Sequence, residues 1–151
     1  MKIVLFAAAI LCLTTSAFAQ TANKDYDAEL AKRLGGNDNG MKRYVLVILK
    51  SGGNTTAEKS VTDEAFKGHM KNMDRLADEG KLVLASPLGK NEKSYRGIFI
   101  MNVETVDAAR ELVLTDPAVK ANLLDAEYYP LFGSAAIQET VNIHKKIQKF
   151  Q

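Results

Sequence analysis

The run of consecutive apolar residues from Tyr44 to Leu49 limits the possible folds more than any other stretch of this sequence. It reads Tyr-Val-Leu-Val-Ile-Leu, is rich in β-branched residues and is followed by Ser51-Gly52-Gly53-Asn54. This pattern is typical of a strand that is buried on both faces of its sheet. The rest of the chain must therefore cover two sheet faces, with helices or with another copy of the sheet.

A helix is predicted after this strand, with Ser60 or Thr62 as its cap and Gly80 at the residue after its end. Apolar positions in it recur at three- and four-residue steps and form one stripe. The stripe consists of Phe66, His69, Met70, Met73, Leu76 and Ala77. Charged residues lie largely opposite, so one face of this helix is expected to pack against a core.

Two more strands, Leu82–Ala85 and Arg96–Val103, are predicted next, and the second of them lacks strict alternation, as a central strand does. Thr105 can cap a second helix. That helix should end by Asp116, because a proline at residue 117 disfavours helical dihedrals in the residue before it. Asp116 followed by Pro117 also suits the start of another short helical turn, with Asp116 as its cap.

A fourth strand is predicted over Leu124–Phe132, and Pro130 places its end at a sheet edge or beyond the ladder. A C-terminal helix should follow from about Ile137. The order of strand, helix, strand, strand, helix, strand predicts an α+β fold of the ferredoxin-like split βαβ type, with both helices on one face of an antiparallel sheet. The other, apolar face would be exposed in a monomer, which predicts a homodimer.

The N-terminal residues have the pattern of a secretory signal peptide, residues 1–19. Lys2 is followed by the short apolar run Ile3–Leu13, and Ala17-Phe18-Ala19 fits a cleavage site. A run this short does not span a membrane, and a retained anchor is the alternative reading. We expect a periplasmic or secreted protein that begins at Gln20. It would lack Cys12, the one cysteine of the chain, and with it any thiolate nucleophile or disulfide.

The mature chain divides into three predicted parts. Residues 20–40 are expected to form a flexible, loosely ordered arm, with a possible short helix over Ala28–Leu34. Residues 41–137 form the main domain, and residues 138–151 the C-terminal helix. The formal net charge of +2 and the absence of tryptophan argue against a nucleic-acid partner.

An ordered set of short motifs resembles the YCII-related family from about Lys42 to Ile137. The motifs are Met41–Leu46, His69, Glu79–Leu82, Pro87, Arg96–Phe99, Ala108-Ala109, Thr115–Lys120, Pro130 and Phe132–Ala136. The resemblance implies a ferredoxin-like dimeric α+β barrel. It also implies an acid–base pair at His69 and Asp116, and small, often aromatic-derived substrates, as in dehydrochlorination of a chlorinated hydroxyquinol.

His69 and Asp116 are also the residues that elementary chemistry selects. His69 is the one side chain of its stripe that can both take up and release a proton near neutral pH. Antiparallel helices on one sheet face would bring the two residues together, and a carboxylate on one ring nitrogen would leave the other for a substrate. The alternatives stay open: a core histidine satisfied by a backbone carbonyl, and an aspartate that only caps the Pro117 turn.

The remaining candidates are substrate-binding residues. Ser86 could donate a hydrogen bond to an oxyanion, and Pro87 lies beside it near the expected pocket mouth, although Ser-Pro is also a common turn. Tyr44 and Tyr129 could line an aromatic pocket or simply pack in the core. The two histidines, His69 and His144, are far apart and lack a carboxylate cluster, so no metal is expected.

Two functions from different classes are compatible with this sequence. The first is a small lyase- or isomerase-like enzyme that uses the His69–Asp116 pair on a small organic substrate and needs no cofactor. The second is a non-catalytic domain that binds a small ligand or a protein partner. A haem site is a more distant third, and no insertion into a membrane is expected once the signal peptide is removed.

Overall fold

The computed structural model describes residues 23–149, so the predicted signal peptide, its cleavage site and Cys12 lie outside the described residues. The helices and strands follow the predicted order. They are α1 (Ala28–Leu34), β1 (Met41–Ser51), α2 (Lys59–Asp78), β2 (Leu82–Pro87), β3 (Tyr95–Met101), α3 (Val106–Val113), α4 (Pro117–Lys120), β4 (Leu124–Ser134), the 3₁₀ helix η1 (Ala135–Glu139) and α5 (Thr140–Ile147). Within residues 23–149, no helix combines the length and apolar character that crossing a membrane requires.

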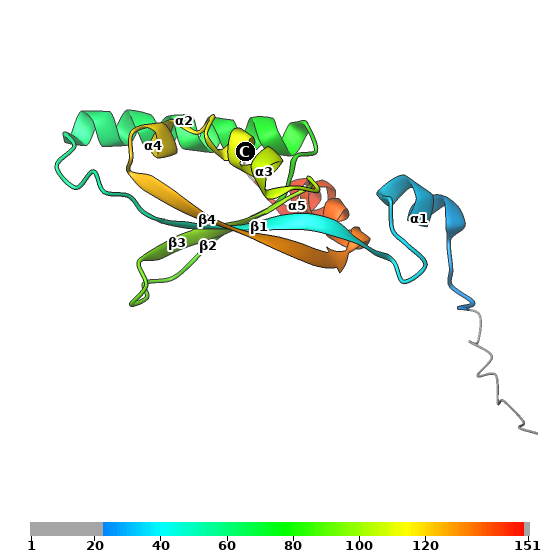
Figure 1. Ribbon diagram of the computed structural model, residues 1–151. Helices are drawn as coiled ribbons and strands as arrows, with labels where there is room; N and C mark the ends of the chain where they lie inside the picture. The colour runs from blue at the N-terminus through cyan, green and yellow to red at the C-terminus, as the bar shows by residue number, and fades with distance from the viewer. Residues whose placement is uncertain (1–22, 150–151) are drawn as a thin grey trace, which may run out of the picture.

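The four strands form one antiparallel sheet in the order β2-β3-β1-β4 (Figure 1). This arrangement confirms the predicted α+β ferredoxin-like fold, and it confirms that β3 is a central strand. Pro130 of β4 pairs with Val45 of β1. β4 is an edge strand, and proline is accepted there because it has no amide hydrogen to donate to a further strand.

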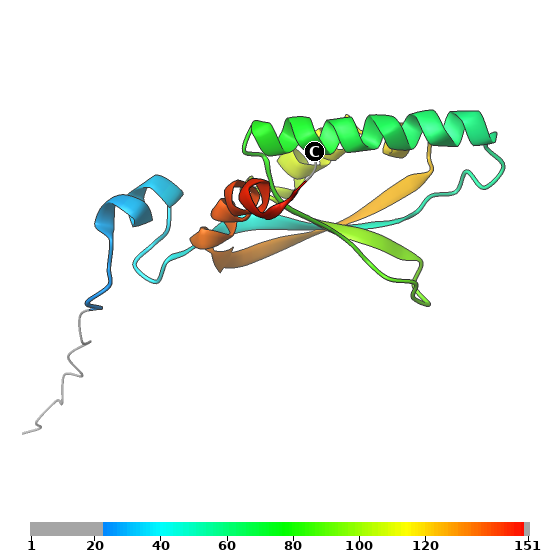
Figure 2. The same ribbon diagram turned by 180° about the vertical axis from the view of Figure 1, so that it is seen from behind.

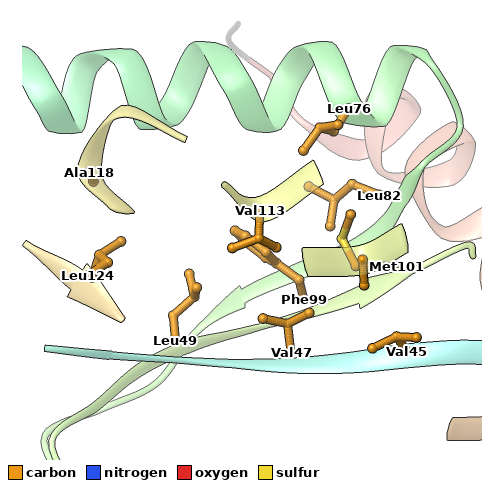
Figure 3. Packing of buried hydrophobic residues seen from close by; sticks show 11 residues of the cluster. Val45, Val47, Leu49, Leu76, Leu82, Phe99, Met101, Val113, Ala118 and Leu124 are labelled. Carbon is orange, nitrogen blue, oxygen red and sulfur yellow. The ribbon is translucent and has the colours of Figure 1, made fainter. Parts of the chain in front are cut away.

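Helices α2, α3 and α4 lie over one face of this sheet (Figures 1 and 2). Val45, Val47 and Leu49 of β1 point toward the helices and are almost fully buried. Figure 3 shows them facing Leu76 of α2 across a layer of apolar side chains that includes Phe99 of β3. This layer is the core of the domain.

The opposite sheet face, here called the open face, carries Leu46, Ile48, Leu84, Ile98 and Ile100. The pairings Leu46↔Ile100, Ile48↔Ile98 and Leu84↔Ile100 place these five side chains on one side of the sheet. All five are only half-buried. Leu46 and Ile48 of β1 are therefore not fully buried within one chain.

Several predicted boundaries were wrong by a few residues. Helix α2 begins at Lys59 after Glu58, which makes no capping bond through its side chain, so neither Ser60 nor Thr62 is the cap. Strand β2 runs on to Pro87, which pairs with Gly97, and β4 runs on to Ser134. Pairing with a neighbouring strand extends both elements beyond the point where turn-forming residues predicted an end.

Other helix ends are as predicted. Gly80 has φ 66°, and the amides of Gly80 and Lys81 bond back to Ala77 and Leu76 at 3.0 and 2.8 Å, the Schellman arrangement. Thr105 caps α3 by accepting a bond from the amide of Ala108 at 3.2 Å.

The described part of the N-terminal arm is folded rather than loose. Helix α1 has the bounds considered possible from the sequence, and Leu34 at its end is buried. Gln138 of η1 donates a hydrogen bond to the carbonyl of Leu34 at 2.6 Å, and Arg33 pairs with Glu139 at 2.7 Å. Burial of Leu34 against η1 thus orders this part of the arm. The predicted C-terminal helix is likewise divided into η1 and α5.

Candidate functional site

His69 and Asp116 are in direct contact. Nδ1 of His69 lies 2.6 Å from Oδ2 of Asp116, across 47 residues of sequence. The imidazole is 12% exposed and the carboxylate 2% exposed. His69 comes from the middle of α2, and Asp116 from the junction between α3 and α4. The structure therefore brings together the two residues that were predicted to form a pair.

Asp116 also caps the N-terminus of α4. Its Oδ1 atom accepts a hydrogen bond from the amide of Ala118 at 2.9 Å, with Pro117 at the first position of α4. The cap is therefore confirmed, and it uses one carboxylate oxygen while the other faces His69. The cap alone does not account for the contact with His69, and the catalytic role of the pair stays a prediction.

Aromatic side chains hold the imidazole ring of His69. Phe99 of β3 is stacked on it with ring centroids 6.1 Å apart and an interplanar angle of 20°, and Phe66 meets it edge-on at 6.1 Å. In a neutral ring, a carboxylate at Nδ1 requires the proton to be on Nδ1. The lone pair then lies on Nε2, the ring nitrogen that Asp116 does not contact.

A pocket of about 290 Å³ lies between α2 and the sheet, with His69 in its wall. The other lining residues are Leu49, Phe66, Met70, Met73, Ala85, Ser86, Pro87, Arg96, Gly97, Phe99 and Leu124. The walls are mostly apolar, and the volume suits a small molecule rather than a large cofactor. A pocket of this kind excludes much of the water around His69.

A larger and more open hollow of about 460 Å³ lies between α2 and α4. Its lining includes Ser60, Glu64, Gly68 and Pro117 but neither His69 nor Asp116. The smaller pocket is the better candidate site, because it alone of the two combines enclosure with a residue able to transfer protons.

Two of the four predicted substrate-binding residues, Ser86 and Pro87, line the pocket with His69. Both are exposed on β2, an edge strand of the sheet. The hydroxyl of Ser86 lies 3.4 Å from the carbonyl oxygen of Pro87, within the same segment. The Ser-Pro pair is part of a strand rather than a turn between elements.

The two predicted tyrosines do not line the pocket. Tyr44 is 1% exposed, and its hydroxyl donates toward the carbonyl oxygens of Ser134 and Ala135, at 3.1 and 3.3 Å. Burial raises the pKa of this hydroxyl. Tyr129 pairs with Leu46, so it shares the open face with that residue. Neither tyrosine therefore lines the pocket around His69, and Tyr44 packs in the core, which is the other alternative given for it.

Sequence reasoning missed Arg96 as a pocket residue, and it missed a polar cluster beside Asp116. Asn72 of α2 is 9% exposed, and its Oδ1 atom accepts a bond from Arg75 at 2.8 Å and lies 3.0 Å from the hydroxyl of Thr115. This cluster ties α2 to the residue before Asp116. The contacts of Arg75 and Asn72 with Thr115 span 40 and 43 positions, so no local pattern could have revealed them.

A separate charged cluster lies at one end of the open face. Lys50 pairs with Asp125 at 3.2 Å and with Glu127 at 3.1 Å, and the hydroxyl of Tyr129 donates to Glu127 at 2.9 Å. The hydrogen bond with Lys50 lowers the pKa of Glu127, and the same bond raises that of Lys50. Within residues 23–149, no three histidine, cysteine or acidic side chains come together in a way that could hold a metal ion.

Comparison with known proteins places this chain within a family. A model of the YCII-related domain matches residues 43–131, more than half of the chain. No curated protein matches it. Among solved structures, the chain is similar to 5-chloro-2-hydroxyhydroquinone dehydrochlorinase from Burkholderia phenoliruptrix in complex with 2,5-dihydroxybenzoquinone. The two are 21% identical over 56% of this chain and 90% of that chain, with a TM-score of 0.40.

Proposed function

From the premise that this chain belongs to the YCII-related domain family, we propose that it is a small lyase- or isomerase-like enzyme that uses His69 as its general base. The observation that carries the proposal is the 2.6 Å contact between His69 and Asp116 in the wall of an apolar pocket. A proton-transfer residue, an orienting carboxylate and a space for a substrate occur together there.

The chemistry follows from the two ring nitrogens. Nε2 of His69 would remove a proton from a substrate carbon that lies next to an electron-withdrawing group. Asp116 would stabilise the imidazolium that forms and hold the ring in place. The electron pair left on the substrate then has two outcomes. It takes the proton back at another atom, which is an isomerisation, or it expels a leaving group from the adjacent carbon, which is a lyase reaction.

Deuterium exchange tests the general base without knowledge of the full reaction. A panel of small organic compounds with acidic C–H bonds is incubated with the protein in heavy water, and loss of proton signals is followed by NMR. A compound that exchanges in the presence of the wild-type protein should lose roughly 100-fold or more of its rate with His69→Gln. Asp116→Asn should also lose rate while it keeps the cap, because asparagine caps nearly as well as aspartate.

His144→Gln is the matched control. It is the same substitution at the other histidine of the chain, which is exposed on α5 and does not line the pocket. Its exchange rate should equal that of the wild type. If compounds bind in the pocket but none exchanges, or if His69→Gln exchanges as fast as His144→Gln, the non-catalytic binding function is the correct one.

Two further properties belong to this proposal. The half-buried apolar side chains of the open face support a homodimer in which two open faces pack together. The signal-peptide pattern of residues 1–19 supports export, so the enzyme would act in the periplasm or outside the cell.

A further inference from the structure

Arg96 reaches the pocket because of an irregularity in strand β3. Leu49 of β1 pairs with Gly97, but its neighbour Lys50 pairs with Tyr95, so Arg96 is an extra residue on β3. Such a β-bulge redirects a side chain and is frequent next to functional sites. Regular alternation from Ile98, which lies on the open face, would place residue 96 on that face too. Arg96 instead lines the pocket together with Leu49 and Gly97.

The close approach of the strands at this place depends on the residue next to Arg96. A Cβ atom at Gly97 would lie 2.9 Å from the carbonyl oxygen of Ser86 on β2. The carbonyl of Arg96 in turn accepts a hydrogen bond from the amide of Leu88 at 2.9 Å. The backbone of residue 96 is thus tied to the residue that follows β2.

The guanidinium group of Arg96 forms no ion pair with a carboxylate of residues 23–149. No aspartate or glutamate lines the pocket, and the carboxylate of Asp116 is behind the ring of His69 and 2% exposed. Arg96, an exposed residue, is therefore the one permanently charged residue of a lining that is otherwise apolar apart from His69 and Ser86. A cationic or neutral ligand would leave that guanidinium without a counter-ion.

We propose that Arg96 is the anion-binding residue of this pocket, and that the bound molecule is a flat, ring-sized organic anion with a carboxylate or phenolate group. The inference rests on the proposed function, because it assigns a ligand class to the same pocket. Guanidinium groups bind carboxylates through two parallel hydrogen bonds. Phe66, Phe99 and the methionines of α2 supply apolar contacts for a ring, and the volume of about 290 Å³ limits its size.

Binding of a matched pair of probes tests this ligand class. Benzoate carries the charge, and benzamide has nearly the same shape without it. Each is titrated into the full mature chain near neutral pH, and the ring nitrogen signals of His69 are followed by NMR, assigned with His144→Gln. Benzoate should bind roughly 10-fold more tightly than benzamide or better, the discrimination expected of a charge-assisted hydrogen bond.

Three variants locate the source of the preference. Arg96→Gln should remove the preference for benzoate, and Arg96→Lys should keep part of it because the charge remains. Lys93→Gln is the control. It removes the same charge from the same hairpin, at a lysine that lies over the ring of Tyr95 and does not line the pocket. The preference should be unchanged in this variant.

The outcomes separate this inference from the proposed function. Equal binding of benzoate and benzamide, or an unchanged preference in Arg96→Gln, overturns the role of Arg96 but leaves the general base intact. Failure of both probes to shift the signals of His69 overturns the ring-sized ligand. The deuterium-exchange rates of wild type and His69→Gln then judge the proposed function separately.

Discussion

Gly68 of α2 lies directly against Pro117 of α4. A Cβ atom at residue 68 would be only 2.7 Å from Cγ and 3.1 Å from Cβ of Pro117, so the two elements approach this closely because residue 68 has no side chain. The next residue along α2 is His69, and the residue before Pro117 is Asp116. The closeness of Gly68 and Pro117 therefore sets the distance between the two side chains of the candidate catalytic pair.

Gly68→Ala is expected to push α4 away from α2. The added methyl group meets a proline ring that is part of the backbone, and overpacking of this kind costs about 1–3 kcal/mol. Thermal unfolding should show the loss of stability, and the NMR signals of the His69 ring should shift as the contact with Asp116 lengthens. Gly89→Ala is the control, because nothing lies within 4 Å of a Cβ at residue 89.

Thr115→Val should weaken the support of Asp116 while leaving the carboxylate in place. The change keeps the shape of the side chain but removes a hydroxyl that contacts Asn72 and accepts a bond from Arg75 at 3.0 Å. Thr115 is exposed and Asn72 keeps its bond from Arg75, so the loss should be about 0.5–1.5 kcal/mol, the net contribution of one hydrogen bond. Urea unfolding measures this loss. Thr56→Val, at an exposed loop position, should unfold like the wild type. Equal midpoints for the two variants would show that the cluster contributes nothing.

Glu127→Gln should change the dependence of stability on pH. The hydrogen bond from Lys50 lowers the pKa of Glu127, so its contribution is fully present above the pKa of the unfolded chain and is lost as the pH falls through the lower folded value. Urea midpoints of wild type and variant should differ at neutral pH and converge in acid. Glu104→Gln, an exposed glutamate outside this cluster, should not reproduce the convergence.

The open face predicts a dimer that a single charge disrupts. Light scattering at low micromolar concentration should give the mass of two chains for the wild type. Ile98→Lys places an ammonium group in the apolar centre of the open face and should yield monomers, because an unpaired buried charge is costly. Ile143→Lys is the same change at a residue that is 55% exposed on α5, and it should remain dimeric. A stable wild-type monomer would contradict the barrel.

Export is tested by the N-terminus of the natural protein. N-terminal sequencing of the protein recovered from the cell envelope fraction should begin at Gln20, as the pattern Ala17-Phe18-Ala19 predicts. Replacing Ala19 with a bulky residue should block cleavage and leave the longer chain in that fraction. Recovery of an intact Met1 from the wild-type protein would contradict the signal peptide.

The amino-acid sequence by itself determined the order of the elements and the chemistry available to them. Helix and strand signals act over a few residues, so the apolar stripe of α2, the cap at Thr105 and the turn begun by Asp116 and Pro117 were all predictable. The residue types also limited which side chain could transfer a proton, since histidine is the only type in the stripe of α2 that can take up and release a proton near neutral pH. The motifs that resemble the YCII-related family indicated the same pair, His69 and Asp116.

Only the tertiary structure decided which side chains meet. Strand register decides which sheet face a side chain occupies, and this is why Tyr44 and Tyr129 do not line the pocket around His69. The same geometry explains Arg96, which lines the pocket because it is itself the extra residue of the bulge in β3. Contacts between segments 47 residues apart depend on the packing of α2 against α4, which no local sequence pattern encodes.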